Sequence, residues 1–242
     1  QIFFEMKKIG RIRINRLIIL GIILIQVSSC KKEDPIIVTD IDGNTYSAVT
    51  IGKQVWMAEN LKTTKLNDRS SIPLVTSNST WTSTTRAAYC WYNNDTTYKA
   101  LYGGLYNWFA VATGKLCPSG WHVPSHEEFK ALEKSLGMTQ TAADSWGWRG
   151  TDQGKKLKNT TGWDDNGNGT NSSGFSALAG GYRYGATGDF FNKGMLSYWW
   201  TSDKNNSNLG LYRRLDNNQT MVYAEGVRLQ AGKYVRCVKD SI

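Results

Sequence analysis

Few of the features that mark the commonest functional classes occur after residue 29 of this sequence. No long aliphatic run follows that point, and the chain has only two histidines. Lysines and arginines are scattered among aromatic residues and glycines, so no basic cluster favours nucleic acid. The 10 Trp, 12 Tyr and 24 Gly, with the shortage of aliphatic runs, argue against a helical bundle.

Signatures of the best-known catalytic sites are also missing. The chain contains no ordered Ser/His/Asp pattern, no His-Glu-x-x-His helix and no glycine loop of the kind that cradles phosphate. No cluster of thiolates or carboxylates accompanies His122, so we interpret it as a core or loop hydrogen-bonding residue rather than a metal ligand. A pair of carboxylates for glycoside hydrolysis stays open, because such partners are distant in a chain.

The N-terminal segment has the layout of a signal peptide. Five basic residues precede an apolar stretch at 17–27, which has eleven residues and is interrupted by Gln26. A membrane-spanning helix needs about 20 apolar residues, so a cleaved segment is the better interpretation. We expect translation to begin at Met6 and residues 1–29 to be removed, which lowers the formal net charge from +9 to +5 by removing five basic side chains and one acidic one.

The residues at the expected cleavage point, VSSC (27–30), resemble the lipobox of bacterial lipoproteins. The resemblance implies that the thiol of Cys30 is acylated and anchors the chain to a membrane. Residues 30–35 then form a lipidated, charged tether, which should stay solvated. Its sequence resembles the surface-export signal of Bacteroidetes lipoproteins, with a plain polar spacer as the alternative. We therefore expect an outer-membrane lipoprotein that faces either the medium or the periplasm.

Three cysteines remain after Cys30, in a compartment where disulfides persist. Spacing alone does not choose among the three pairings of Cys90, Cys117 and Cys237. We predict Cys117 with Cys237, because that bond closes a 120-residue loop and ties the end of the chain to its middle. Cys90 lies between two aromatic residues and is interpreted as a buried, unreactive thiol.

The sequence pattern predicts an α+β domain with one clear helix. Asp42-Gly43 lies between two alternating runs (36–40 and 46–51) and indicates a β-hairpin. Ser125, with Glu128 three residues later, indicates the start of an amphipathic helix that Gly137 ends. His126 and Glu127 fall on its first turn, where we expect exposed residues without a catalytic role. Short β-prone runs separated by turns follow at 175–178, 182–184, 198–201, 211–215, 221–223 and 234–238.

Six segments, in order, carry a resemblance to a known family. They are QVWMAENL (54–61), YCWYNND (89–95), YGGLYNW (102–108), CPSGWHVP (117–124), GFSALAGGYR (174–183) and VRCV (235–238). The chain from residue 36 to 242 is similar to the Fibrobacter succinogenes major paralogous domain. That family of exported, often lipidated proteins is similar to formylglycine-generating-enzyme and C-type-lectin-like folds, which implies short antiparallel strands and long loops. Its molecular function is not established.

The resemblance does not extend to formylglycine-generating activity. Those enzymes need reactive cysteines close together near the C-terminal part of the fold, and this chain has only Cys237 there. We therefore interpret the shared segments as residues that determine the fold rather than as catalytic residues.

A lectin-like function has two candidate features. Asp164, Asn166 and Asn168 alternate before Gly169, as oxygen ligands do in calcium loops, although no acidic residue closes the loop and a metal-free surface turn is the alternative. Tryptophans beside glycine-rich loops could stack on sugars or anchor a protein, or could fill the core. Adjacent residues on a strand face opposite ways, so one of the last two should be exposed. These tryptophans are Trp146, Trp148, Trp163, Trp199 and Trp200.

Taken together, the sequence predicts a lipid-anchored, non-enzymatic surface domain that binds an extracellular glycan or protein. An enzyme that modifies polysaccharide or protein at the cell surface is the first alternative, and a structural component of surface assemblies is the second.

The lipid anchor is directly testable. Replacing Cys30 with Ala removes the acylated thiol, so the protein should leave the membrane fraction, and mass spectrometry should find no acyl chains. A Cys30→Ala protein that stays fully in the membrane fraction, with the same mass as expected for an unacylated chain, would show that another element holds it there.

Overall fold

The computed structural model describes residues 36–206 and 209–241. The expected signal peptide (1–29) and the tether (30–35), with Cys30, lie outside these residues. The unit Pro35–Ile242 makes its contacts within itself and forms one compact body. In the described part of the chain no helix is long and apolar enough to cross a membrane.

The first sheet joins the two ends of the domain. Its order is β1-β2-β3-β13-β6, and every pairing is antiparallel. The hairpin predicted around Asp42-Gly43 is confirmed: the carboxylate of Asp40 accepts hydrogen bonds from the backbone of Asp42 and of Asn44, both at 2.9 Å. The strands are β1 (Ile36–Thr39), β2 (Thr45–Ile51), β3 (Gln54–Met57), β6 (Trp121–His122) and β13 (Val238–Lys239).

The second sheet has six strands in the order β7-β12-β11-β10-β8-β9, and only the β10–β8 pairing is parallel. Four of the expected late runs fall on its strands, whereas 175–178 is a loop and 234–238 reaches a strand only at its last residue. The strands are β7 (Gly147–Arg149), β8 (Gly180–Arg183), β9 (Phe190–Lys193), β10 (Leu196–Asn206), β11 (Leu209–Asp216) and β12 (Val222–Arg228). A small ladder pairs β4 (Tyr89–Cys90) with β5 (Leu105–Tyr106).

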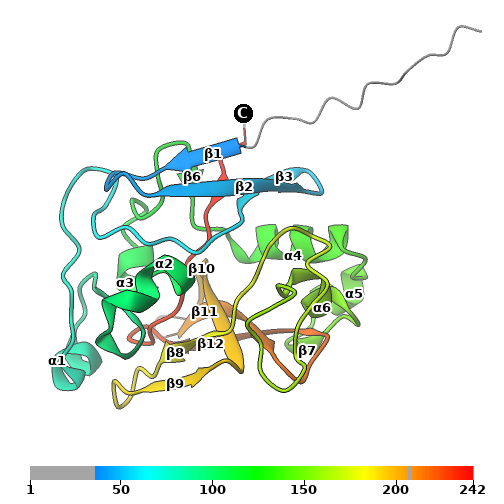
Figure 1. Cartoon of the computed structure of the whole chain (residues 1–242). Coiled ribbons are helices and arrows are strands. Elements are labelled where there is room, and N and C mark those ends of the chain that lie inside the picture. Colours follow the sequence, from blue (N-terminus) through cyan, green and yellow to red (C-terminus); the bar gives the residue numbers. More distant parts are fainter. Residues whose placement is uncertain (1–35, 207–208, 242) are drawn as a thin grey trace, which may run out of the picture. The chain divides into compact units, whose positions relative to one another are not determined.

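Helices flank the two sheets, which lie one above the other in Figure 1. The predicted amphipathic helix is α4 (His126–Ser135), and Ser125 and Glu128 form the expected capping box. Both α2 (Lys99–Tyr102) and α3 (Trp108–Val111) lie on the side opposite to α4. The others are α1 (Asn78–Ser83), α5 (Gln140–Ala143), α6 (Gln153–Leu157) and the 3₁₀ turns Tyr92–Asn94 and Thr96–Tyr98. The fold is α+β.

Two hydrophobic clusters form the core, one on each face of β10. Trp199 packs with Trp56, Phe129 and Phe175 in the first cluster, and Trp200 packs with Tyr106 in the second. Charged side chains are also buried beside the first cluster. Glu133 of α4, fully buried, accepts from Arg149 and Arg213, which ties the helix to β7 and β11. One carboxylate shared by two guanidiniums satisfies most of these buried groups.

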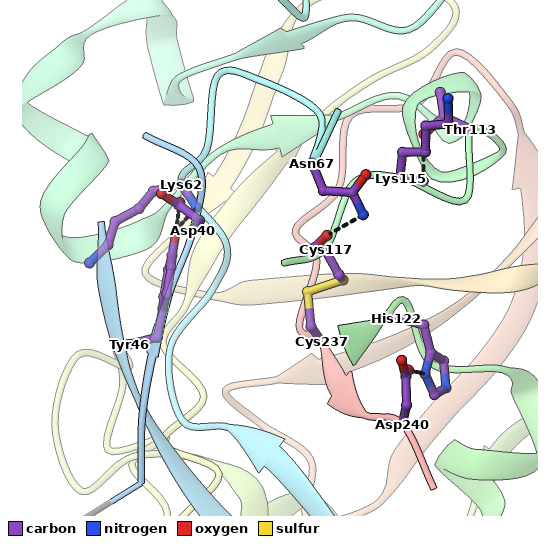
Figure 2. Close-up of a disulfide and its surroundings, with 10 residues drawn as sticks. All are labelled: Asp40, Tyr46, Lys62, Asn67, Thr113, Lys115, Cys117, His122, Cys237 and Asp240. Carbon is purple, nitrogen blue, oxygen red and sulfur yellow. Dashed lines mark hydrogen bonds and ion pairs between the residues drawn. A yellow bond between two sulfur atoms is a disulfide. The ribbon is translucent and has the colours of Figure 1, made fainter. Parts of the chain in front are cut away.

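The disulfide links Cys117 to Cys237, as predicted, and Figure 2 shows its surroundings. Cys237 directly precedes β13, and its carbonyl accepts from the backbone N–H of Met57 at 3.0 Å. Asn67 donates to the carbonyl of Cys117 at 3.2 Å. The bond therefore holds the last strand between β3 and β6. Cys90 is free and fully buried, and burial raises the pKa of its thiol to about 12, which leaves it unreactive.

The disulfide should make a large contribution to stability. Replacing both Cys117 and Cys237 with Ser opens a loop of 120 residues in the unfolded chain, which lowers the free energy of unfolding by about 4 to 5 kcal/mol in the chain-entropy model. Urea denaturation followed by tryptophan fluorescence measures this difference. Cys90→Ala is the control, because it removes a thiol but no cross-link. A double variant as stable as the control would mean that the bond does not constrain the unfolded state.

Candidate binding surface

One side chain from each strand of the six-stranded sheet lies in a single row across the face that also carries Trp200. Tyr198 of β10 lies opposite Arg214 of β11, and Arg214 lies opposite Tyr223 of β12. Tyr223 in turn lies opposite Trp148 of β7. Opposed residues in antiparallel strands point to the same face, so these side chains are neighbours.

The row continues across the parallel pairing into β8 and β9. The rings of Tyr198 and Tyr182 are 4.7 Å apart between centroids, and Tyr182 lies opposite Phe191 with 6.0 Å between their rings. We call this set the aromatic row. It consists of Phe191, Tyr182, Tyr198, Arg214, Tyr223 and Trp148.

Arg214 is the one charged member of the row and lies between rings. Its guanidinium carbon is 5.0 Å from the ring centroid of Trp148 and 4.7 Å from that of Tyr223. Two nitrogens of the same group donate to both carboxylate oxygens of Asp216 at 2.6 Å. Stacking and a bidentate ion pair fix the position of this cation. The row is therefore a rigid surface rather than a set of free side chains.

Solvent reaches most of the row. Phe191 is 41% exposed, Trp148, Tyr182 and Tyr223 are half-buried, and Tyr198 is buried. Adjacent to Tyr223, Glu225 is exposed and accepts a hydrogen bond from the Tyr223 hydroxyl at 2.6 Å. The surface thus combines flat apolar rings with hydroxyl, carboxylate and guanidinium groups at their edges.

Beneath the row lies a buried lysine without a carboxylate partner among the described residues. The Nζ atom of Lys233 is 3.8 Å from the ring centroid of Tyr198 and 4.1 Å from that of Tyr212. Burial, with Arg214 nearby, holds the pKa of Lys233 well below its usual value. Aromatic ring faces are the groups that surround this amine.

The structure brings only part of the predicted tryptophan set to the surface. Trp146 is 53% exposed and Trp148 is half-buried. Trp163, Trp199 and Trp200 are all less than 5% exposed, so their predicted role as surface-binding residues is wrong. Alternation does place Trp199 and Trp200 on opposite faces of β10, but both faces are covered. Tyr106 and Trp108 cover the face of β10 that carries Trp200, and the indole N–H of Trp200 donates to the carbonyl of Tyr106 at 2.8 Å.

Sequence reasoning missed most of the aromatic row. Tyr182, Tyr198 and Tyr223 each fell on a run that was expected to be a strand, and their alternation with small or apolar residues was the available signal. What places them side by side is the register between strands that are far apart in the chain, which no local pattern reveals.

A family model described as the Fibrobacter succinogenes major domain matches residues 49–239. The chain belongs to this family. All six segments that carried the resemblance lie within the matched range. No curated protein matches the chain, and no solved structure matches it.

The expected calcium loop of this Fibrobacter succinogenes major domain is an exposed turn that the protein's own hydrogen bonds close. The side-chain oxygen of Asn168 accepts from the backbone N–H of Trp163 at 3.0 Å, and the side chain of Asn217 donates to the carboxylate of Asp165 at 3.1 Å. Asn166 has a φ of 59°, as a tight turn requires. Among residues 36–206 and 209–241, no group of three or more His, Cys, Asp or Glu could hold a metal. Calcium at Asp164, Asn166 and Asn168 stays a prediction.

The two histidines occupy different environments near the start of α4. His126 is half-buried rather than exposed, and burial together with Arg213 lowers its pKa to about 4. Glu127 is exposed, as expected. His122 lies between two carboxylates, Asp240 at 2.6 Å and Glu128 at 2.8 Å, and both of these residues line a cavity of about 480 Å³. Both of its ring nitrogens are engaged, so neither is free to take a proton from a substrate.

His122 should make stability depend on pH. Burial lowers its pKa, but the hydrogen bonds with Asp240 and Glu128 outweigh burial, and the net pKa is raised above 6.5. A raised pKa contributes stability that is fully present below the unfolded pKa and is lost as pH rises through the folded pKa. The loss of stability caused by His122→Gln should therefore be larger at about pH 5 than at about pH 9. Urea denaturation at both pH values measures it, and an equal loss at both would contradict the charged bridge.

Proposed function

We propose that this domain is a lipid-anchored, non-enzymatic binding module that recognises an extracellular glycan through the aromatic row. The observation that supports the proposal is a line of ring faces across an entire sheet with its polar groups at the ring edges. Rings offer apolar faces to the C–H faces of sugars, and arginine, carboxylate and hydroxyl groups bond to sugar hydroxyls.

The shape of the surface favours a chain-like ligand over a small molecule. The row crosses all six strands from β9 to β7, and Tyr184 extends it with a ring 6.3 Å from Phe191. Binding in this mode needs no catalytic groups. The carboxylate of Asp216 is occupied by Arg214, and that of Glu225 accepts from Tyr223, so this surface does not present two free convergent carboxylates for hydrolysis.

The proposal includes the cell-surface location and the relation to lectin-like folds. Lipidation of Cys30 and a solvated tether at 30–35 would hold the domain at the outer membrane. Sparse helices, short strands and adjacent N- and C-terminal strands in one sheet are features that support a C-type-lectin-like or formylglycine-generating-enzyme-like fold. This likeness is an analogy, and the aromatic row carries the functional argument without it.

Trp146 and Trp148, which are separated by a single residue, provide a matched test. The soluble domain, residues 34–242, would be screened on immobilised glycans and on cell-wall extracts, with calcium and with chelator. Trp148→Ala removes a ring of the row and should weaken binding at least about tenfold, or about 1.4 kcal/mol. Trp146→Ala removes a more exposed indole that stacks on His126 instead, and it should leave the affinity unchanged.

Other results would redirect or reject the proposal. Equal losses in both variants, or no glycan binding by the wild-type domain, would reject the aromatic row as a glycan site. Binding lost in chelator but kept in Trp148→Ala would move the site to Asp164, Asn166 and Asn168. A protein partner lost only in Trp148→Ala would keep the surface and replace the glycan.

A further inference from the structure

A second cavity lies away from the aromatic row, on the other face of β10. Its volume is about 130 Å³. The loop after β3, the helix α2 and the loop at 176–178 form its walls, and Leu101 at its rim is 58% exposed. Arg236 lines the cavity although only 2% of this side chain is exposed. A charged group therefore borders a small space that connects to solvent.

The guanidinium of Arg236 is incompletely satisfied. Its Nε donates to the side-chain oxygen of Asn60 at 3.1 Å, and its Nη2 donates to the carbonyl of Ser176 at 3.3 Å. Its face lies 4.1 Å from the ring centroid of Phe175. Its Nη1 is buried and has no acceptor among the residues that the structure describes. A buried donor without a partner costs about 1 to 3 kcal/mol, and more when it is charged.

Other buried guanidiniums of this domain have acceptors for their charge. Arg149 and Arg213 share the carboxylate of Glu133. Arg183 donates to the carbonyls of Gly188, Val75 and Thr76 and to the side chain of Asn78. Like Arg183, Arg236 has no carboxylate of the described residues within ion-pair distance, but unlike Arg183 it has a terminal nitrogen without an acceptor. Arg149 also has one buried nitrogen without a partner, its Nε, but its charge is paired with Glu133.

The nearest acidic group does not fill this role. Glu59 also lines the cavity, but its carboxylate forms an ion pair with Lys62 at 3.1 Å and accepts from the backbone N–H of Ser47 at 3.1 Å. Burial lowers the pKa of Arg236 to about 9, so the group is still protonated at neutral pH. Arg236 therefore borders the cavity with a positive charge that has no carboxylate within ion-pair distance among the described residues.

Four of the six family segments meet at this cavity. Asn60 comes from the first segment, Gly103 from the third, Ser176 from the fifth and Arg236 from the sixth. Gly103 has a φ of 79°, and a Cβ there would lie 2.7 Å from the carbonyl oxygen of Leu61. Segments that lie between residues 54 and 238 thus shape one small space, whereas the aromatic row draws mainly on residues outside them.

We propose that this cavity binds a carboxylate group, with Arg236 as the donor that recognises it. Carboxylate oxygens match the fork of a guanidinium, and Arg236 lines the cavity without a carboxylate partner of its own. The cavity has room for a carboxylate and the atoms attached to it. The carboxylate could belong to the uronic acid of a glycan or to a small free organic acid.

The experiment is a titration of the domain with acetate, with galacturonate and with neutral galactose, at constant ionic strength. The indole N–H of Trp199 is the reporter, because it donates to Asn60 at 2.8 Å and Asn60 accepts from Arg236. Saturable shifts of this NMR signal with acetate or galacturonate, but not with galactose, are expected. A response to both acids indicates the free acid as a sufficient ligand, and a response to galacturonate alone indicates a uronic acid.

Arg236→Gln removes the guanidinium and should abolish the response to both acids. A second variant leaves Arg236 in place and keeps the test valid if Arg236→Gln does not fold. Ala100→Phe adds a ring at the rim of the cavity and should weaken acid binding by at least about tenfold. Ala131→Phe, on the exposed face of α4, is the matched control. No saturable shift with either acid, the same shift with galactose or with sodium chloride, or equal binding by Ala100→Phe and the control would each overturn the proposal. Trp148→Ala should bind the acids normally, so the glycan proposal and this one fail independently.

Discussion

Strand β10 is covered on both of its faces, and Trp199 and Trp200 lie one on each. Both indoles are fully buried, and both ring N–H groups have an acceptor at 2.8 Å: Asn60 for Trp199 and the carbonyl of Tyr106 for Trp200. Tryptophan buries more apolar area than any other side chain, so each cluster depends on its own indole. The register of one strand therefore holds the two halves of the core together.

Both candidate sites depend on this strand. On the face that carries Trp200, Tyr198 occupies the middle of the aromatic row, between Tyr182 and Arg214. On the opposite face, Trp199 shares the side-chain oxygen of Asn60 with Arg236. A shift of β10 by one residue would exchange these faces, which would break up the row and remove each tryptophan from its own cluster. Packing and function impose the same constraint on the sequence here.

Local signals predicted the elements that local chemistry determines. Asp42-Gly43 marked a hairpin, Ser125 with Glu128 marked the start of α4, and the 120-residue loop favoured the disulfide that forms. Burial of Trp199 and Trp200 was missed because their cover comes from Tyr106 and other residues distant in the chain. The aromatic row and the unpartnered Arg236 were missed for the same reason: cross-strand register and burial depend on contacts between distant residues.

The surroundings of three cationic side chains, Lys233, Arg214 and Arg236, explain why the row is a rigid surface and why the cavity beside Arg236 differs from the rest of the core. Ring faces surround the amine of Lys233, and Asp216 pairs with Arg214, so that both side chains are held in place and fix the orientation of the rings around them. A surface ordered before binding loses little side-chain entropy on binding. Arg236 has one ring face and two neutral acceptors, and one donor left over. Arg149 also has an unpartnered nitrogen, but Glu133 pairs with its charge, whereas Arg236 has no paired carboxylate and lines a cavity that a ligand can enter.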